Sequence, residues 1–445
     1  MALFVRSFKR IATLTTLGAG LVFGSLSAFA IEIQRIETPG GIEAWLVEEH
    51  AVPLVTMSVG FKAGSFDDPK GKEGLASMVS SLLDEGAGDM DSLAFQKRLE
   101  DKAIRMGFSA SRDSFSASLN TLSKNKEEAF DLFRLALTQP RFDDEAVERI
   151  RDQILVAHEQ QEEDPQTISS RTWYETAFGD HPYARRSLGT GDSIKSITKT
   201  DLRGFLKSKI ARDRMFVAVV GDIDPDSLSS LLDKTFADLP AGSDPIVEDR
   251  IEIENSGTVK VVDRDIPQSV MVFGSKGVLR DDPDFMPAYV MNYVLGGGGF
   301  ASRLMEEVRE KRGLTYGIYT YLVPLDRSGL YMGQVSTENA KAGETLSLVR
   351  AEFKKLRENG ITEEELKNAK TYLTGSYPLR FDSNSKIAGQ LVAIQLEELG
   401  IDYIDKRNEL IDAVTLEDIK RVAERLLDPD NMIISIVGKP ENLDG

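Results

Sequence analysis

Few side chains in this sequence could carry out catalysis by themselves. The 445 residues include no cysteine, which excludes thiol catalysis and cysteine-ligated metal. Only three histidines are present: His50, His158 and His181. Three serines lie close together, Ser77, Ser80 and Ser81, but no Gly-x-Ser-x-Gly elbow surrounds them and no histidine is placed to activate them. The sequence therefore argues against a serine hydrolase.

A run of four glycines is the second feature of chemical interest. It comprises Gly296, Gly297, Gly298 and Gly299. A glycine-rich loop can cradle a phosphate, but the Gly-Lys-Ser/Thr ending of a phosphate-binding loop does not follow this one. Farther on, Gly313 suits the position that ends a helix, and Tyr316 is expected to start a strand of alternating pattern.

The elements that must position these residues are a mixture of strands and helices. Apolar residues alternate from Val55 to Phe61, which predicts a half-buried strand, and the continuous apolar run 215–220 predicts a fully buried one. Val147, Ile150 and Ile154 share one face of a predicted helix that begins near Asp143. Thr362 and Glu365 form a capping box at the start of another helix. Such runs of strands and helices indicate an α+β fold.

The chain also repeats itself. Residues 48–69 match residues 262–283 at an offset of 214, so that Gly60 corresponds to Gly274, and both segments end in Asp-Asp-Pro. Residues 197–221 match residues 414–438 at an offset of 217. Two nearly equal offsets at opposite ends of each copy indicate an internal duplication. We expect two homologous α/β sandwich domains in a clamshell-like arrangement, at 31–238 and 251–445, joined by a Pro- and Gly-containing linker at 239–250.

The first thirty residues are typical of a secretory signal peptide. Three basic residues precede an uncharged stretch from Ile11 to Phe29, and small residues at Ala28 and Ala30 favour cleavage after Ala30. The apolar part is too short and too broken to predict a membrane anchor. We expect the mature chain to be periplasmic, and its 415 residues are long enough to bury large cores without disulfides.

The charge of the chain argues against several kinds of partner. The formal net charge is −18, and removal of the signal takes away three positive charges and no negative ones, leaving −21. Such an acidic chain is not expected to bind nucleic acid or anionic lipid, and we expect no membrane association after the signal is cleaved.

The stretch that starts at Gly74 resembles the zinc motif of the pitrilysin, insulysin and mitochondrial-processing-peptidase family. In that family, Gly-x-Ala-His-x-x-Glu-His supplies two zinc-binding histidines and a general base, and a glutamate about seventy-five residues later completes the site. Here the histidine positions are Ser77 and Ser81, the base position is Ser80, and the downstream ligand falls near Ala157. Serine is a poor zinc ligand and a poor base, and His158 alone does not rebuild the site. The resemblance therefore implies a family member without a metal of its own.

The second half of the chain resembles the same family at a different motif. There the glycine-rich loop, Gly296 to Gly299 in this chain, lies near the bound peptide. An Arg-x-x-x-Gly-Leu-x-Tyr element, here Arg309 to Tyr316, places an arginine and a tyrosine over the zinc site. The resemblance implies that Arg309 anchors the peptide backbone and that Tyr316 donates a hydrogen bond to the oxyanion formed during hydrolysis.

Together these features predict the non-catalytic half of a heterodimeric zinc peptidase that degrades unfolded peptides in the periplasm. The chain itself would hold no cofactor and would be inactive alone. Zinc would be held by a homologous partner that bears the His-x-x-Glu-His motif. Arg309 and Tyr316 would complete the partner's site. An edge strand expected within residues 107–120, marked by Phe115 and Ala117, would receive an extended peptide. The alternative is a structural or peptide-binding protein of the same family with no role in proteolysis.

Overall fold

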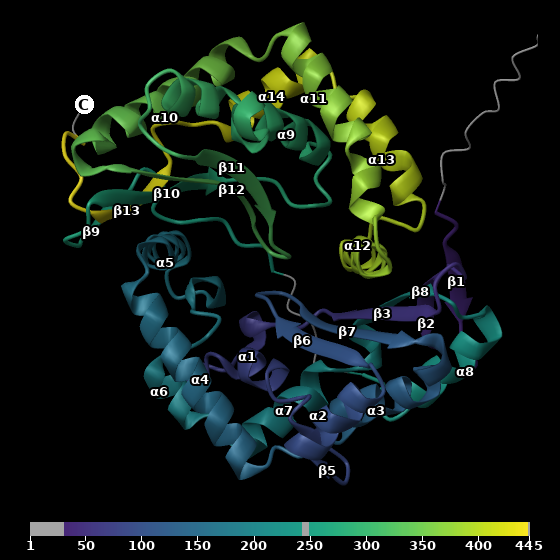
Figure 1. The fold of residues 1–445 in the computed structure, drawn as a ribbon. Helices are drawn as coiled ribbons and strands as arrows, with labels where there is room; N and C mark the ends of the chain where they lie inside the picture. Colours follow the sequence, from purple (N-terminus) through teal and green to yellow (C-terminus); the bar gives the residue numbers. More distant parts are fainter. Residues whose placement is uncertain (1–30, 243–248, 444–445) are drawn as a thin grey trace, which may run out of the picture. The chain divides into compact units, whose positions relative to one another are not determined.

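The computed structural model describes residues 31–242 and 249–443, and the predicted signal peptide lies outside them. The first half contains a six-stranded sheet in the order β1-β2-β8-β3-β7-β6 (Figure 1). All neighbouring strands are antiparallel except β2 and β8, which run parallel. The strands are β1 (Gln34–Glu37), β2 (Glu43–Glu48), β3 (Leu54–Phe61), β6 (Arg105–Ala110), β7 (Phe115–Leu122) and β8 (Met215–Gly221).

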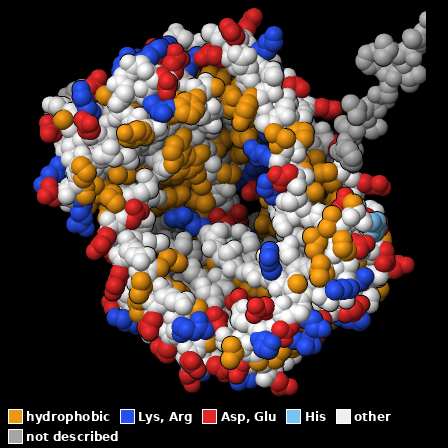
Figure 2. Space-filling view, viewed as in Figure 1, with side chains coloured by type: hydrophobic (Ala, Val, Ile, Leu, Met, Phe, Trp, Pro, Cys, Tyr) orange, Lys and Arg blue, Asp and Glu red, His pale blue; other side chains and the backbone are white. Residues whose placement is uncertain are grey.

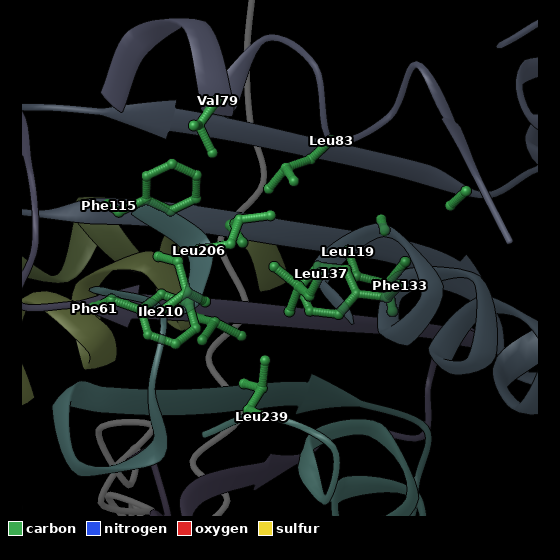
Figure 3. Close-up of a cluster of buried hydrophobic side chains, with 14 of the residues drawn as sticks. Phe61, Val79, Leu83, Phe115, Leu119, Phe133, Leu137, Leu206, Ile210 and Leu239 are labelled. Atoms are coloured by element: carbon green, nitrogen blue, oxygen red, sulfur yellow. The ribbon is translucent and has the colours of Figure 1, made fainter. Parts of the chain in front are cut away.

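Helices bury the apolar face of this first sheet. The small hairpin of β4 (Gly86–Ala87) and β5 (Met90–Asp91) lies beside them. Figure 3 shows side chains such as Phe115 and Leu119 of the sheet converging with Phe133 and Leu206 of the helices. The helices of this half are α1 (Leu75–Ser80), α2 (Ser92–Asp101), α3 (Lys126–Thr138), α4 (Asp144–Glu163), α5 (Pro165–Phe178), α6 (Gly191–Ser196), α7 (Lys199–Lys209) and α8 (Pro225–Phe236).

The second half repeats this plan around a five-stranded sheet in the order β11-β12-β10-β13-β9. Figure 2 shows hydrophobic side chains gathered over the region of α9, β11 and β12. The strands are β9 (Val259–Asp263), β10 (Gln268–Lys276), β11 (Ile318–Pro324), β12 (Gly329–Glu338) and β13 (Ile433–Gly438). The helices are α9 (Phe285–Asn292), α10 (Ala342–Asn359), α11 (Glu363–Gly375), α12 (Asn384–Leu396), α13 (Tyr403–Asp412) and α14 (Leu416–Leu426).

Strand pairing reproduces the repeat that the sequence shows. In the first sheet Gly60 pairs with Phe216, and in the second sheet Gly274 pairs with Ile433, at the offsets of 214 and 217. The strands β8 and β13 both end in a glycine with positive φ, 141° at Gly221 and 139° at Gly438. The two halves therefore share strand register, and the prediction of an α+β fold with two related domains is confirmed.

Two helices cross from one half to the other. Helix α5 packs on β10 and β13 of the second sheet, and helix α12 packs on β3 and β8 of the first (Figure 1). Trp173 of α5 donates from Nε1 to the carbonyl of Ile433 at 3.0 Å, and Gln395 of α12 donates from Nε2 to the carbonyl of Val217 at 3.1 Å. Each sheet thus has its own helices on one face and a helix of the other half on the opposite face.

Several local predictions can be compared with these elements. Helix α4 carries Val147, Ile150 and Ile154 on its buried face, and Thr362 and Glu365 form the expected capping box at α11. The expected edge strand was placed partly wrong: β6 is the edge, whereas β7, which carries Phe115 and Ala117, is paired on both sides. An inner strand with one buried face has the same alternation as an edge strand, so the pattern does not separate the two.

The domain boundaries remain a prediction. At the start of the predicted linker, Leu239 is buried and the carbonyl of Pro240 accepts from the amide of Arg212 at 2.9 Å, so these residues pack with the first half. Residues 243–248 lie outside the described part. None of the described helices is long and apolar enough to cross a membrane.

The crossing of α12 over β3 requires a glycine at position 60. A β-carbon there would lie 2.7 Å from Cγ1 of Val392 and 2.9 Å from Cδ1 of Leu396. We expect Gly60→Ala to lower the free energy of unfolding by about 1–3 kcal/mol, because the side chains of Val392 and Leu396 must repack or the helix must shift outward. Urea denaturation measures this.

Gly107→Ala in the same sheet is the matched control. Its β-carbon would lie 3.6 Å from Oγ of Ser118, which is an ordinary contact, so stability should change by less than about 0.5 kcal/mol. Equal stability of the two variants would contradict the close packing of α12 against Gly60.

Candidate functional site

The three serines of the altered zinc motif lie on or next to the short helix α1. Ser77 and Ser80 are buried, whereas Ser81 is exposed. Oγ of Ser77 donates to the carbonyl of Ser187 at 2.9 Å. Oγ of Ser80 and Oγ of Ser81 donate to the carbonyl of Ser77 at 2.8 and 3.0 Å. The hydroxyl protons of the three serines are therefore used in bonds to the backbone.

A buried carboxylate fixes the start of α1. Oδ2 of Asp68 accepts from the amide of Gly74 at 2.8 Å, and Oδ1 accepts from the amide of Ala76 at 2.9 Å. Burial raises the pKa of Asp68 to about 7, although these amide donors act in the opposite direction. Asp68 belongs to the repeated Asp-Asp-Pro sequence, so this repeat element holds the helix that carries the motif.

The downstream ligand position, Ala157, lies on α4, which packs beside α1. Ala157 has no donor for a metal. His158 is next to it, with Nε2 4.0 Å from Oε1 of Glu162, and the same oxygen accepts from Arg171 at 2.6 Å and from Arg186. Burial opposes ionisation of Glu162, but the arginines outweigh it and lower its pKa. The carboxylate of Glu162 is thus paired with cationic side chains of this same chain.

The residues present do not fit a zinc ion. Among residues 31–242 and 249–443, no three His, Cys, Asp or Glu side chains are grouped as metal ligands. The other two histidines have local roles. His50 lies between Glu48 and Asp222, which raise its pKa, Asp222 more strongly. His181 accepts from the amide of Tyr183 at 3.2 Å. The positions that hold the zinc ligands in the family are therefore occupied in this chain by serine and alanine, and the serine hydroxyls are bonded to the backbone.

The glycine-rich loop lies at the end of α9, on a π-helical turn from Tyr293 to Gly297. A β-carbon at Gly296 would lie 2.4 Å from Oγ1 of Thr320, so the turn needs glycine to approach β11. Beneath it, Oγ1 of Thr320 donates to Oδ1 of Asn292 at 2.8 Å and accepts from the hydroxyl of Tyr331 at 3.0 Å. The loop is therefore supported by a buried hydrogen-bond network.

Arg309 lies on a second π-helical segment, Met305–Glu310. Its guanidinium carbon is 4.5 Å from the centre of the Phe300 ring, and Nη1 is 2.9 Å from Oε1 of Glu310. Phe300, which follows the glycine run directly, is 69% exposed. π-helical turns are rare and frequent at functional sites, and here one leads into the glycine loop and the other carries Arg309.

Tyr316 is almost fully exposed, at 89%, and is not part of a strand. We expected it to start the strand that follows, but β11 begins at Ile318, and Tyr316 lies in a bend before it. The bend is fixed by Thr315, whose Oγ1 donates to the carbonyl of Ser336 at 2.7 Å. Gly313, with φ of 63°, ends the preceding helical segment as expected. A fixed backbone thus presents a free tyrosine side chain.

The structure keeps the two motifs apart. The serines and Ala157 belong to the first half, and Arg309, Tyr316 and the glycine loop belong to the second. Within the described residues, no hydrogen bond or ion pair joins the two sets. The supporting residues Asn292 and Thr315 and the aromatic partner Phe300 were not identified from the sequence, and only the position of Phe300 directly after the glycine run could have drawn attention to it.

Comparisons with known proteins agree on one family. The model described as insulinase (peptidase family M16) matches residues 45–191, and the model described as peptidase M16 inactive domain matches residues 196–373. The non-peptidase homolog YmxG of Helicobacter pylori is 30% identical over 82% of this chain and 84% of its own length. An uncharacterized zinc protease of Streptomyces coelicolor is 25% identical over 89% of this chain and 87% of its own length. The crystal structure of a peptidase M16 inactive domain from Pseudomonas fluorescens has a TM-score of 0.86 and 32% identity, covering 92% of this chain and 98% of that one.

The filled motif predicts that the purified chain does not retain zinc. After equilibrium dialysis against micromolar zinc, with any affinity tag removed, we expect well under about 0.1 zinc per chain, because serine and alanine supply no suitable donor. Elemental analysis by mass spectrometry measures this. One zinc retained per chain would show that a metal site exists elsewhere in the protein.

Proposed function

The chain belongs to the insulinase family of peptidases, family M16, as a member that lacks the zinc motif, and from this premise we propose that it is the non-catalytic subunit of a two-chain zinc peptidase. One observation carries the proposal: the motif positions that could hold metal are filled by residues such as Ser77 bonded to the backbone, while Tyr316 stays exposed on a fixed bend. A relative whose name describes it as a non-peptidase homolog supports the loss of independent activity. Zinc is then held by a partner that bears the complete motif.

Tyr316 can serve a reaction that takes place on another chain. Hydrolysis of a peptide bond passes through a tetrahedral oxyanion, and a phenolic O–H is a hydrogen-bond donor suited to that oxygen. Tyr316 is 89% exposed, so its hydroxyl can enter a partner's site. The backbone beside it is pinned by Thr315, so the donor needs little reorganisation to reach the position where charge develops.

Arg309 can bind the peptide backbone next to that oxygen. Its side chain is 29% exposed, and its guanidinium lies over the ring of Phe300. Stacking on an aromatic ring restricts an arginine side chain without using all of its N–H donors. Nη1 is paired with Glu310, and the remaining donors can bind peptide carbonyls.

The proposed substrates are unfolded peptides in the periplasm. Their extended backbone can pair with a free strand edge, which accepts many sequences because the bonds are made by the main chain. In this chain β6, rather than β7, has the free edge. The glycine loop, whose Gly299 has φ of 58°, offers main-chain groups to the same peptide. Periplasmic location rests on the predicted signal peptide.

A second candidate function is that of a structural or peptide-binding protein with no role in proteolysis. The name of the relative YmxG, a non-peptidase homolog, is compatible with it. Under this alternative, Arg309 and Tyr316 take part in no reaction.

An activity assay with two chains separates these functions. We expect hydrolysis of a quenched peptide only when the mature chain is mixed with the His-x-x-Glu-His-bearing homologue from the same genome, and loss of hydrolysis with a chelator, because each chain supplies part of the site. Hydrolysis by this chain alone would contradict the proposal. If the mixture hydrolyses no peptide although both proteins are folded, the structural alternative is favoured.

Substitution of Tyr316 tests its role within the mixture. Tyr316→Phe should leave assembly intact and lower kcat by at least about tenfold, because one oxyanion donor is removed. Tyr372→Phe is the control: Tyr372 is 58% exposed and stacks on Tyr293, and its loss should leave kcat unchanged. An unchanged kcat in Tyr316→Phe would remove Tyr316 from the mechanism.

A further inference from the structure

A second site lies in the second half, where a cavity of about 230 Å³ opens between α9, α12, α13 and the turn before α12. It adjoins a cavity of about 410 Å³, and the two share Arg280, Glu397 and Leu399 in their walls. In Figure 2, Lys and Arg side chains lie between the apolar region of α9, β11 and β12 and the helices α12 and α13. The smaller cavity is below the roughly 300–1,000 Å³ of drug-sized sites, so its ligand must be small.

Tyr377 is one of the residues that line this cavity, and its hydroxyl is an unused polar group. The residue is only 4% exposed, and its hydroxyl makes no hydrogen bond within the described part of the chain. Leaving a buried hydroxyl without a partner is costly, and such groups in folded proteins call for a ligand or another explanation. Burial raises the pKa of Tyr377 to about 12, so the hydroxyl keeps its proton and can donate.

Arg407 lines the same wall and is also 4% exposed. Its guanidinium carbon is 4.0 Å from the centre of the Tyr377 ring. Nη1 donates to the carbonyl of Leu373 and to Oδ1 of Asn408, both at 3.1 Å. Among the described residues, no ion pair with a carboxylate neutralises Arg407. Buried charges are normally paired, so the cavity has a positive end that an anion would complete.

A carboxyl group, that of Glu397, lies in the wall that the two cavities share. Glu397 is half-buried and has no hydrogen-bond partner for its carboxylate among the described residues. Burial raises the pKa of Glu397 to about 7, and Arg280 and Lys62 partly oppose the shift. The charges that act on Tyr377 are instead Arg407 and Arg380. The two groups therefore have different charged neighbours, and only Glu397 lines both cavities.

Aromatic and aliphatic side chains form much of the remaining wall of the smaller cavity. Arg280 lies over Phe285 at 4.1 Å and donates to the hydroxyl of Tyr403 at 2.7 Å, which holds both walls in place. Met286 and Ile394 add apolar surface. A ligand that fits these walls has an apolar or aromatic body.

We propose that this cavity binds a small zwitterion with an apolar side chain, that is, a free α-amino acid or a dipeptide. The ligand carboxylate accepts from the Tyr377 hydroxyl and from Arg407, the ammonium pairs with Glu397, and the side chain lies against Phe285 and Ile394. Such molecules are the end products of peptide breakdown. The site is separate from Arg309 and Tyr316 and does not depend on the partner chain, so it can be tested with this chain alone.

Calorimetric titration of the full mature chain with the dipeptide Ala-Phe and with L-phenylalanine tests the ligand class. We expect saturable one-to-one binding of at least one of them. Analogues that lack one charge, phenethylamine and 3-phenylpropionate, should bind at least about tenfold more weakly, because one buried ionic group is left unpaired. No saturable binding of either zwitterion up to 10 mM (roughly the weak limit for a specific site) would overturn the proposal, as would equal binding of the analogues.

Two conservative variants test the residues. Tyr377→Phe should weaken binding of the zwitterion about tenfold or more and should not lower the Tm of the free protein, because it removes a hydroxyl that has no partner. Tyr319→Phe, on β11 and outside the cavity walls, is the control and should bind normally. Normal binding by Tyr377→Phe would overturn the role of the hydroxyl, since a merely structural tyrosine would give that result.

The pH dependence tests Glu397. Its carboxyl ionises near pH 7, so affinity should rise between pH 6 and 8 as the carboxylate forms, and Glu397→Gln should bind weakly at both pH values. The other charged groups around Glu397 are Arg280, Lys62, Asp326 and Asp113. Burial raises the pKa of Asp326 to about 6. Any pH dependence of the affinity that remains in Glu397→Gln therefore reports the contribution of Asp326. Equal affinity of the wild type at pH 6 and 8 would overturn the pairing with Glu397.

Discussion

The structure depends on the exchange of one helix between the two halves. A β-sheet with two apolar faces must cover both, and in each half the second face is covered by a helix from the other half. Glycines at equivalent positions, Gly60 and Gly274, let these helices approach: a β-carbon at Gly274 would lie 3.0 Å from Cζ2 of Trp173. A buried ion pair, Asp113 with Arg327 at 3.2 Å, also joins the halves. The two sheets are therefore packed as one unit rather than as independent domains.

Segments that flank the exchanged helices contribute residues to the altered zinc motif and to the cavity of the second half. The segment after α5 returns to the first half, where the carbonyl of Ser187 accepts from Ser77 and closes the position at which the family has a histidine. The turn before α12 carries Tyr377, and the residue just after α12 is Glu397. The segments beside the exchanged helices thus supply polar groups to both places.

The altered zinc motif of the first half and the cavity of the second half differ in how their buried polar groups are bonded. Around the altered zinc motif, the serine hydroxyls and the Asp68 carboxylate bond to backbone groups, and Glu162 bonds to arginines. This is the pattern of a site that has become structural, because the serine hydroxyl protons and the Asp68 oxygens are already bonded to the backbone. By contrast, the exposed Tyr316 and the buried hydroxyl of Tyr377 both have donors that no described residue uses.

The sequence by itself determined the family, the α+β repeat and the loss of the zinc ligands. These depend on residue identity and spacing, since a strand alternates with period two, and serine or alanine cannot replace histidine or glutamate at a zinc ion. The sequence also located the helix of Val147 and Ile154 and the capping box of Thr362. Tertiary structure alone decided that β6 rather than β7 is the edge strand and that Tyr316 precedes its strand. It also decided that Tyr377, Arg407 and Glu397 line one cavity. Their side chains are brought together by packing between elements, and local periodicity carries no information on which elements pack together.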